Sequence, residues 1–344
     1  MPSRTHDVAP GASAPVARTT DPRARRITLV VNPAAGGGRG RRTAAEAASR
    51  LTARGMRVRT VETLDAEHAA QEARRAFDRG DVAVAVGGDG MLRILAGEAV
   101  LRDDAVVGLL PAGRGNDFAR FLGLPTDQEA ATETLACGVE ALLDTGVARG
   151  SDGVDRTFLS IVSIGFDAEA NRIANAAPPA LGGLVYVVGA VGALAGLRPV
   201  PLRIVADGAE RASTVLLLAV ANSGAYGGGM HMAPHASLGD GVLDVVAVPH
   251  RGRPDRCGWR DRLRILRFLP RVFRGSHVGT RYVELSTART IRVEADGPLV
   301  AYADGDPIGV LPLTISTRPA SLRLLVPAAG GLRSGVDRPS GVAA

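Results

Sequence analysis

Three glycine-rich polar loops carry the residues of this chain that are best suited to chemistry. They span residues 32–40 (NPAAGGGRG), 87–90 (GGDG) and 111–120 (PAGRGNDFAR). Glycine lets a backbone approach a ligand closely, and the amides of such a loop can turn toward an anion. Asp89 adds a carboxylate that can bind a metal ion or a hydroxyl group. We therefore expect these loops to bind a phosphorylated ligand.

Each loop follows a short apolar segment with the character of a buried strand. Strands are predicted at 26–32, 56–61, 82–86 and 106–110, and helices at 43–54 and 66–79. Strands that alternate with helices favour a parallel sheet covered on both faces. The carboxyl ends of parallel strands share one edge, where ligands bind. The three loops are therefore predicted to form one nucleotide site at that edge.

The pattern of the sequence changes after about residue 147. Strands with few long helices between them are predicted at 157–164, 202–206, 214–221, 242–248, 282–286, 290–294 and 312–316. Such a series is typical of a largely antiparallel β domain, here predicted to be a β-sandwich. The predicted organisation is a disordered lead-in at 1–25, an α/β nucleotide-binding domain at 26–147, a β-rich domain at 148–327 and a disordered tail at 328–344.

Taken singly, the loops allow other interpretations. The first does not fit the dinucleotide fingerprint GxGxxG, because Arg41 or Thr43 stands where the third glycine belongs. It is not a Walker loop either, and alone it could be a flexible connector. Asn116 and Asp117 could simply cap the helix that follows them. The coincidence of three such loops is what favours a nucleotide site.

The composition excludes several chemistries. The net charge is +6, and every basic residue is arginine, so no lysine can serve a Walker loop, a protein-kinase site or a Schiff base. Nucleotide phosphates would have to be bound by amides, arginine and a metal. Cys137 and Cys257 are far apart in sequence and lack the spacing of a zinc site, which fits a reducing cytoplasm. His231, His235 and His277 also lack ligand spacing and are expected to be structural or to line a pocket.

The three loops, in this order and spacing, resemble the diacylglycerol kinase catalytic domain of bacterial lipid kinases, a family that includes sphingosine and ceramide kinases. The likeness continues in SIGFDA at 163–168, in the glycine-rich stretch at 222–244, in GSH at 275–277 and in DGD at 304–306. It covers roughly residues 26–327. As an ordered set, these motifs are highly specific.

The resemblance implies an ATP- and Mg²⁺-dependent kinase that phosphorylates diacylglycerol or a related lipid alcohol between two domains. The residues it assigns to the nucleotide are Asn32, Pro33, Ala34, Ala35, Gly36, Thr63, Gly87, Gly88, Asp89, Gly90, Met91, Leu92, Arg93, Arg114, Asn116 and Asp117. It places Asp89 near the phosphates and the catalytic magnesium. It makes Asp306 the catalytic base, with Asp304 close by. Asp240, with backbone oxygens of Ser237 and Val242, matches a structural metal site.

Three departures from the family pattern motivate an alternative. Met91 and Arg114 replace threonines, and Asp306 replaces a glutamate that is one methylene longer, which changes its reach by roughly 1 Å. A degenerate kinase that acts as a lipid- or nucleotide-binding regulator is therefore a second hypothesis. An enzyme like NAD kinase, which has a similar GGDG loop, is a third. The GNDFAR loop and the terminal Asp-Gly-Asp argue against the third.

Two further segments concern the membrane. Residues 251–274 contain nine arginines and two acids, interleaved with apolar and aromatic side chains, which suits an anionic membrane surface. The alternative is a surface helix packed on the β domain. Residues 180–197 form an apolar run whose five glycines favour a buried or membrane-facing helix over a span.

We therefore expect a cytoplasmic, peripherally membrane-associated enzyme. Its lipid acceptor would lie at an anionic membrane, and Tyr226 and residues 227–229 would line the cleft. No nucleic-acid partner is expected, because no stacking module or recognition motif accompanies the charge. Relatives with this pattern are often dimeric, so the resemblance leaves a homodimer open.

Overall fold

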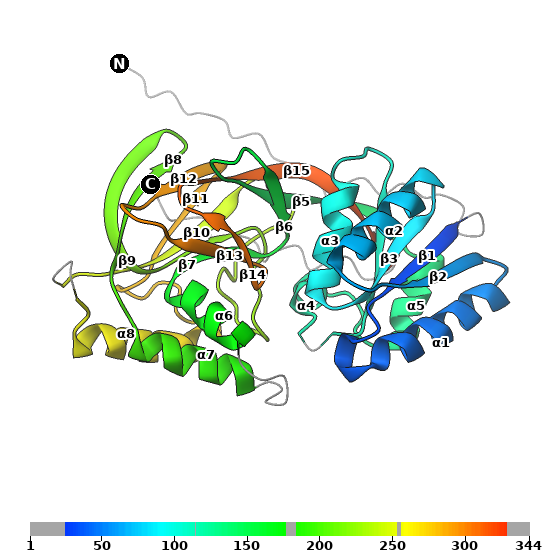
Figure 1. The fold of residues 1–344 in the computed structure, drawn as a ribbon, viewed down its shortest axis with the longest axis horizontal. Helices are drawn as coiled ribbons and strands as arrows, with labels where there is room; N and C mark the ends of the chain where they lie inside the picture. The colour runs from blue at the N-terminus through cyan, green and yellow to red at the C-terminus, as the bar shows by residue number, and fades with distance from the viewer. Residues whose placement is uncertain (1–24, 114, 177–183, 253–255, 329–344) are drawn as a thin grey trace, which may run out of the picture.

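The computed structural model describes residues 25–113, 115–176, 184–252 and 256–328. Figure 1 shows two parts, an α/β part and a β-rich part, joined by long strands that run from one to the other. The predicted fold class, an α/β domain followed by an antiparallel β-sandwich, is confirmed. Arg114 lies outside the described residues, so nothing follows about its place in the site.

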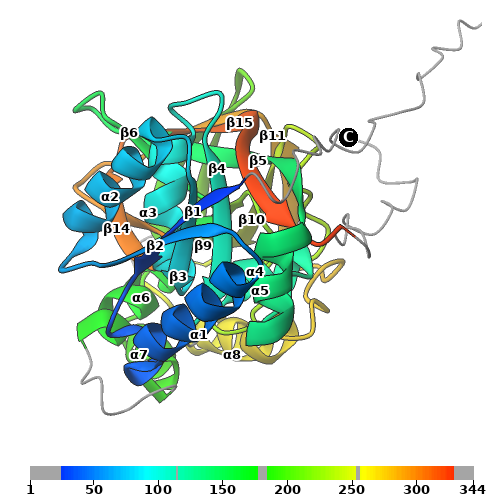
Figure 2. The ribbon, with the colours of Figure 1, turned by 90° about the vertical axis from the view of Figure 1, so that its right-hand side faces the viewer.

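The α/β part is built on four parallel strands in the order β4-β3-β1-β2. Its strands are β1 (Arg26–Val31), β2 (Arg57–Glu62), β3 (Val82–Gly87) and β4 (Val106–Pro111). Its helices are the short 3-10 turn η2 (Ala35–Gly37), α1 (Arg39–Ala53), α2 (Ala66–Asp78), α3 (Asp89–Ala99), α4 (Asp117–Leu122) and α5 (Gln128–Cys137). Helices α1 and α5 cover one face of the sheet, and α2 and α3 cover the other (Figure 2).

The β-rich part is mainly antiparallel. Its strands are β5 (Val139–Arg149), β6 (Asp155–Phe158), β7 (Ile161–Gly165), β8 (Val200–Ala206), β9 (Ala209–Ala221), β10 (Leu243–Pro249), β11 (Glu284–Ala288), β12 (Thr290–Glu294), β13 (Val300–Ala303), β14 (Asp306–Val310) and β15 (Leu313–Val326). Alternating residues of these strands bury one continuous core, which includes Ile164, Ile204, Leu218, Val245 and Ile291. This burial stabilises the part through apolar area removed from water.

The two parts share strands. β15 runs antiparallel to β5, and its last residues pair in parallel with β4. The chain therefore returns to the first sheet after building the second. The predicted domain boundary at 147/148 falls inside β5.

The strand predicted at 157–164 is in fact two strands, β6 and β7. The strand is interrupted between them at Leu159 and Ser160. The backbone amides of these two residues donate to the carboxylate of Asp304, both at 2.8 Å. The carboxylate of Asp304 thus accepts hydrogen bonds from two amides that, in a continuous strand, would pair with a neighbouring strand.

Three helices complete the β-rich part: α6 (Phe166–Ala176), α7 (Leu184–Ala195) and α8 (Trp259–Val272). Their buried side chains pack on the outer face of β9 and β10. The apolar run predicted at 180–197 contains α7, but residues 180–183 lie outside the described part. Within the residues that the structure describes, no helix is both long and apolar enough to cross a membrane.

His277 is buried beneath α8. Its Nε2 lies 2.9 Å from the carbonyl oxygen of Met232, and its ring packs edge-on against Phe268, with 5.2 Å between ring centroids. Burial lowers the pKa of His277. His231 and His235 are exposed.

His277→Gln is expected to flatten the pH dependence of stability on the acid side. Because its folded-state pKa is lowered, the unfolded chain takes up a proton more readily than the folded chain does. Stability from this group is therefore complete above about pH 6.5 and is lost as the pH falls through the lower folded pKa. Urea unfolding at pH values from 5 to 8, roughly spanning that pKa, measures the slope. His235→Gln at an exposed position is the control, and equal slopes for wild type and His277→Gln would contradict the expectation.

Candidate active site

One cavity of about 380 Å³ is lined by the three loops and by four segments of the β-rich part. Its wall is formed by Asn32, Ala35, Gly36, Gly88, Asp89, Gly90, Met91, Gly113, Gly115, Asp117, Ser160, Asn171, Tyr226, Gly227, Asp304 and Gly305. The loops follow β1, β3 and β4, so they meet at the carboxyl edge of the parallel sheet. That edge is where ligands bind in open α/β sheets.

The first loop is held against the third. Gly36 has a positive φ of 59°, and a Cβ atom there would overlap the carbonyl oxygen of Ala112. The side chain of Asn32 closes the turn, because its Oδ1 accepts from the amide of Ala34 at 3.0 Å. Thr63 lies behind this loop, where its Oγ1 donates to the carbonyl oxygen of Val31 at 3.0 Å. The loop therefore requires glycine for its conformation and its packing.

The second and third loops touch backbone to backbone. A Cβ atom on Gly113 would lie 2.5 Å from the Cα atom of Gly88. Asn116 has a left-handed backbone, and its side chain bonds both the amide and the carbonyl of Gly113, at 3.1 and 3.2 Å. Asn116 thus shapes the loop from within. It is not among the described residues of the cavity wall.

Asp89 connects the second loop to α4. Its Oδ2 accepts from the amide of Asp117 and its Oδ1 from the amide of Phe118, each at 3.1 Å. Burial raises the pKa of Asp89, while these two hydrogen bonds act in the opposite direction. Asp117 in turn accepts from the amide of Gly228 at 2.6 Å. Asp89 and Asp117 therefore link the second loop, α4 and, through Gly228, the β-rich part.

Asp304 closes the cavity from the β-rich part. It has a positive φ of 51°, and its carboxylate accepts from the amides of Leu159, Ser160 and Ile161. Burial raises the pKa of Asp304, against the effect of these bonds. Helix α6 braces the same turn, because Asn175 donates to the carbonyl oxygen of Gly305 at 2.7 Å. The side chain of Asp304, which lines the cavity, is thus held in a fixed position.

Asp306 lies beside the cavity rather than in it. Its carboxylate is 56% exposed and forms an ion pair with Arg93 at 2.5 Å. Both residues line a second hollow, which runs between α2, α3 and β14. The two aspartates of the Asp-Gly-Asp motif therefore line different spaces: Asp304 lines the cavity, and Asp306 lines the second hollow with Arg93.

The structure separates the residues assigned by resemblance into two groups. Those in the cavity wall are Asn32, Ala35, Gly36, Gly88, Asp89, Gly90, Met91, Asp117 and Asp304. Described residues outside it are Pro33, Ala34, Thr63, Gly87, Leu92, Arg93, Asn116 and Asp306. Leu92 is fully buried in the core between α3 and the sheet. Its contribution is to hold α3, and hence the loop before it, in place.

The predicted structural metal site lies at a different hollow. Asp240 lines it together with Asp144, near Thr317 and Ala320 of β15. Asp144 is buried, and its two oxygens accept from the amides of Gly241 and Ala320, each at 2.7 Å. Oxygen donors of this kind suit a hard cation such as Mg²⁺. Val242 and Ser237 flank Asp240 in the chain, and the amide of Val242 donates to Asp240 at 3.2 Å.

Sequence reasoning missed several residues of the cavity wall. Ser160 lies in the break between β6 and β7, and Asn171 lies on α6. Tyr226 and Gly227, in contrast, were predicted from the sequence to line a cleft, and both lie in this wall. Tyr226 is buried there, and burial raises its pKa, with nearby Asp167 acting in the same direction. No short motif marks Ser160 or Asn171. The position of Asn171, four residues after Asp167 on one helix face, was the available signal.

Two known domain families and several known proteins match the sequence of this chain. Residues 26–148 match the model of the diacylglycerol kinase catalytic domain, and residues 160–326 match the YegS C-terminal NAD kinase beta sandwich-like domain. A Mycobacterium tuberculosis protein named diacylglycerol kinase is 35% identical over 312 residues, covering 89% of this chain and 96% of that protein. A Bacillus subtilis diacylglycerol kinase is 28% identical, covering 84% and 92%.

A solved structure agrees with the fold. The crystal structure of a candidate diacylglycerol kinase from Bacillus anthracis superposes with a TM-score of 0.72, covering 89% of this chain and 96% of the other, at 20% identity. At this identity the likeness shows the fold. The sequence matches show more, because the Mycobacterium tuberculosis relative is 35% identical over 89% of this chain: this chain belongs to the diacylglycerol kinase family and is a lipid kinase.

Proposed function

We propose that this lipid kinase transfers the γ-phosphate of ATP, with Mg²⁺, to a hydroxyl group of diacylglycerol or a related long-chain lipid alcohol. The observation that carries the proposal is a single cavity walled by three glycine loops on one side and by the Asp304 turn on the other. Phosphoryl transfer depends mainly on positioning and charge neutralisation, and the cavity provides fixed amides and carboxylates for both.

The nucleotide phosphates would bind where the loops present backbone amides. Gly88 caps α3, so the positive end of this helix dipole faces the cavity. Asp89 and Asp117 would hold Mg²⁺ by oxygens that each retain a free lone pair, with waters completing its shell. Bound Mg²⁺ neutralises charge on the phosphates.

Asp306 would accept the proton of the lipid hydroxyl. Its carboxylate is exposed and pairs with Arg93 at the surface, so it can turn toward an acceptor that enters between the two parts. Asp304, in contrast, is committed to three amides and positions the turn that presents Asp306. Asp144 and Asp240 would hold a second, structural Mg²⁺ near the junction of β5 and β15.

The direct test is phosphate transfer from labelled ATP to a panel of lipids in anionic vesicles, with and without Mg²⁺. The panel holds diacylglycerol, a sphingoid base, a ceramide and a simple long-chain alcohol, with NAD as a non-lipid acceptor. A labelled lipid that requires Mg²⁺ supports the proposal. Labelled NAD phosphate would favour an NAD kinase-like enzyme. Measurable ATP binding with no labelled product would favour a regulator.

We also propose that α8 and α7 bind an anionic membrane surface. Exposed side chains recur every seven residues along α8 and the two residues that follow it: Trp259, Leu266 and Phe273 are apolar, and Arg260, Arg267 and Arg274 lie beside them. Its opposite face buries Ile265, Phe268 and Val272. An apolar stripe next to a cationic stripe matches the acyl and phosphate layers of anionic lipid. The two interpretations of this segment, a membrane-binding surface and a helix packed on the β domain, are therefore compatible. One face of α8 packs on the β-rich part, and the other face is exposed.

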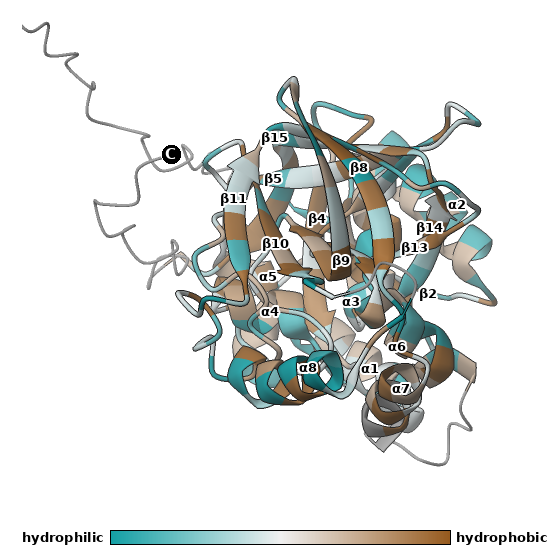
Figure 3. Ribbon diagram, turned by 90° about the vertical axis from the view of Figure 1, so that its left-hand side faces the viewer, coloured by the Kyte–Doolittle hydropathy of each residue, from teal (hydrophilic) through white to brown (hydrophobic). Residues whose placement is uncertain are grey.

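Helix α7 extends this surface. It exposes Val188 and Val191, and Arg262 of α8 donates to the carbonyl oxygen of Ala195 at its end, at 3.4 Å. Figures 1 and 3 show the two helices along the same side of the β-rich part. A bilayer on this side would lie against the part that contributes Asp304 and Asn171 to the cavity.

Replacing Arg260, Arg267 and Arg274 by glutamine is expected to weaken binding to anionic vesicles by roughly 100-fold, because each arginine near such a surface contributes about 1 kcal/mol. Sedimentation with vesicles of increasing phosphatidylserine content measures the partition. Arg57, Arg59 and Arg211 are exposed away from α8, and their triple glutamine variant is the charge-matched control. Equal loss in both variants would show that only net charge matters and would refute a specific surface.

A further inference from the structure

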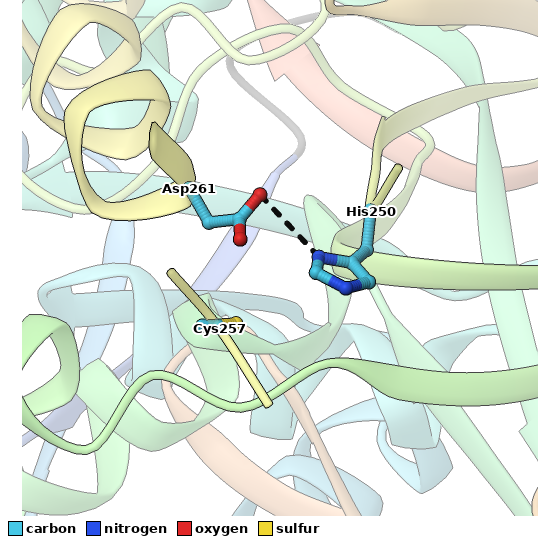
Figure 4. Close-up of side chains that lie close together, drawn as sticks. All are labelled: His250, Cys257 and Asp261. Atoms are coloured by element: carbon cyan, nitrogen blue, oxygen red, sulfur yellow. Dashed lines mark ion pairs between the residues drawn. The ribbon is translucent and has the colours of Figure 1, made fainter. Parts of the chain in front are cut away.

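A second group of metal-ligating side chains lies far from the nucleotide loops, at the start of α8. His250 follows β10, Cys257 precedes α8, and Asp261 lies in its first turn. Figure 4 shows His250 and Asp261 facing one another, with Cys257 beside the gap. The candidate ligand atoms of all three lie within 4.8 Å of one another.

The geometry of the group is close to that of a metal site. His250 Nδ1 lies 3.4 Å from Asp261 Oδ1, and the two side chains are 1% and 7% exposed. In a tetrahedral zinc site, bond lengths near 2.0–2.3 Å put ligand atoms roughly 3.3–3.8 Å apart. The His–Asp separation already falls in that range, and a small side-chain rotation would bring the Cys257 sulfur into it.

The imidazole is held in position by close packing. A Cβ atom on Gly252 would lie 2.8 Å from Cε1 and 3.0 Å from Nε2 of His250. Gly252 therefore leaves room for the ring and little else on that side. A ring that is fixed on one edge and faces a carboxylate on the other presents a defined nitrogen to that carboxylate.

We propose that His250, Cys257 and Asp261 bind one Zn²⁺-like cation, with water as the fourth ligand. Thiolate and imidazole ligands select zinc over magnesium, and three protein ligands with one open position are a known zinc arrangement. The arginines nearby would repel a bare cation. Thiolate and carboxylate together cancel the charge of a divalent ion, so the occupied site adds no net charge to this basic region.

The same side chains admit a simpler arrangement, which the test must separate. Asp261 Oδ2 accepts from the amide of Gly258 at 2.9 Å, and Oδ1 lies 3.4 Å from Arg264. Asp261 could therefore serve only to cap α8 and pair with its neighbours. In the proposed site Oδ2 keeps the cap and Oδ1 turns from Arg264 to the metal. The metal would then tie the end of β10 to the first turn of α8, the helix with the two exposed stripes.

The test is titration of the metal-stripped full chain with Co²⁺, which reports thiolate ligation as a charge-transfer absorption in the near ultraviolet. We expect one equivalent of Co²⁺ to produce this band in the wild type, and Zn²⁺ to displace it. Cys257→Ser should lose the band. Cys137→Ser removes the chain's other thiol, which is exposed, and should retain it.

A third variant guards against misfolding as an explanation. Asp261→Asn retains an oxygen that can accept from Gly258, so α8 keeps its cap, but Co²⁺ affinity should fall by at least about tenfold to a hundredfold. Zn²⁺ should raise the unfolding temperature of wild type and Cys137→Ser, and leave that of Cys257→Ser unchanged. Absence of the band in wild type, or its persistence in Cys257→Ser, would overturn the site and leave a helix cap only.

Discussion

Asp306→Asn is expected to lower the rate of phosphate transfer to lipid by about 10² to 10⁴-fold, the contribution typical of a positioned general base. The amide has nearly the shape of the carboxylate but cannot accept the hydroxyl proton. Stability should change by less than about 0.5 kcal/mol, because the side chain is largely exposed and its pair with Arg93 is a surface ion pair. Single-turnover transfer, with ATP affinity measured separately, isolates the chemical step.

The matched control is Asp78→Asn. Asp78 is also exposed and paired with an arginine, Arg102, at 2.7 Å, but it lies on α2 outside the cavity. It should leave transfer unchanged. If Asp306→Asn retained full transfer, the base would have to be sought elsewhere, first at Asp304, whose carboxylate lines the cavity. A loss of ATP affinity equal to the loss of rate would instead assign Asp306 to nucleotide binding.

The α/β part was predictable because its signals are local. Strands β1, β3 and β4 are apolar runs buried on both faces, and their predicted bounds agree with the observed ones within a residue or two. Helix α1 begins at Arg39, four residues before its predicted start, because Gly38 turns the chain in a left-handed conformation that starts the helix early. The helical periodicity of residues 43–54 does not record that turn.

In the β-rich part some strands were predictable and others were not: β8, β10 and β12 agree with the predicted bounds within two residues. β5 was missed because its residues are buried almost continuously, without alternation, and because it contains Asp144 and Gly146, residue types that are depleted in strands. The division of β6 from β7 depends on Asp304, and that residue's role depends on its left-handed turn. Sequence motifs thus identified both aspartates of the Asp-Gly-Asp turn but not which one lines the cavity.

The His250 group shows the same limit. Its members are spaced His-x₆-Cys-x₃-Asp across the end of a strand, a turn and the start of a helix. Spacing rules for zinc sites assume a hairpin or one helix face, so they do not detect this arrangement. Capping of α8 also gives Asp261 a structural role that needs no metal. Only the fold brings His250 beside it.

Gly113→Ala is expected to reduce kcat/KM for ATP by about 100-fold or more. The added methyl would lie 2.5 Å from the Cα atom of Gly88 and 2.8 Å from Oδ1 of Asn116. Neither neighbour is the free end of a flexible chain, since one is backbone and the other is bonded to Gly113 itself. The second and third loops must therefore separate, and a shift of roughly 1 Å between groups that bind one ligand is enough for this loss.

Gly297→Ala is the control for this substitution, because a Cβ atom there meets nothing within 4 Å and the residue lies far from the loops in sequence. It should leave both ATP affinity and transfer unchanged. Unfolding curves separate loss of the site from loss of the fold: Gly113→Ala should remain folded at the assay temperature while ATP binding weakens. Wild-type ATP affinity in folded Gly113→Ala would mean that the phosphates do not bind between these two loops, and the nucleotide would then have to be placed on the first loop alone.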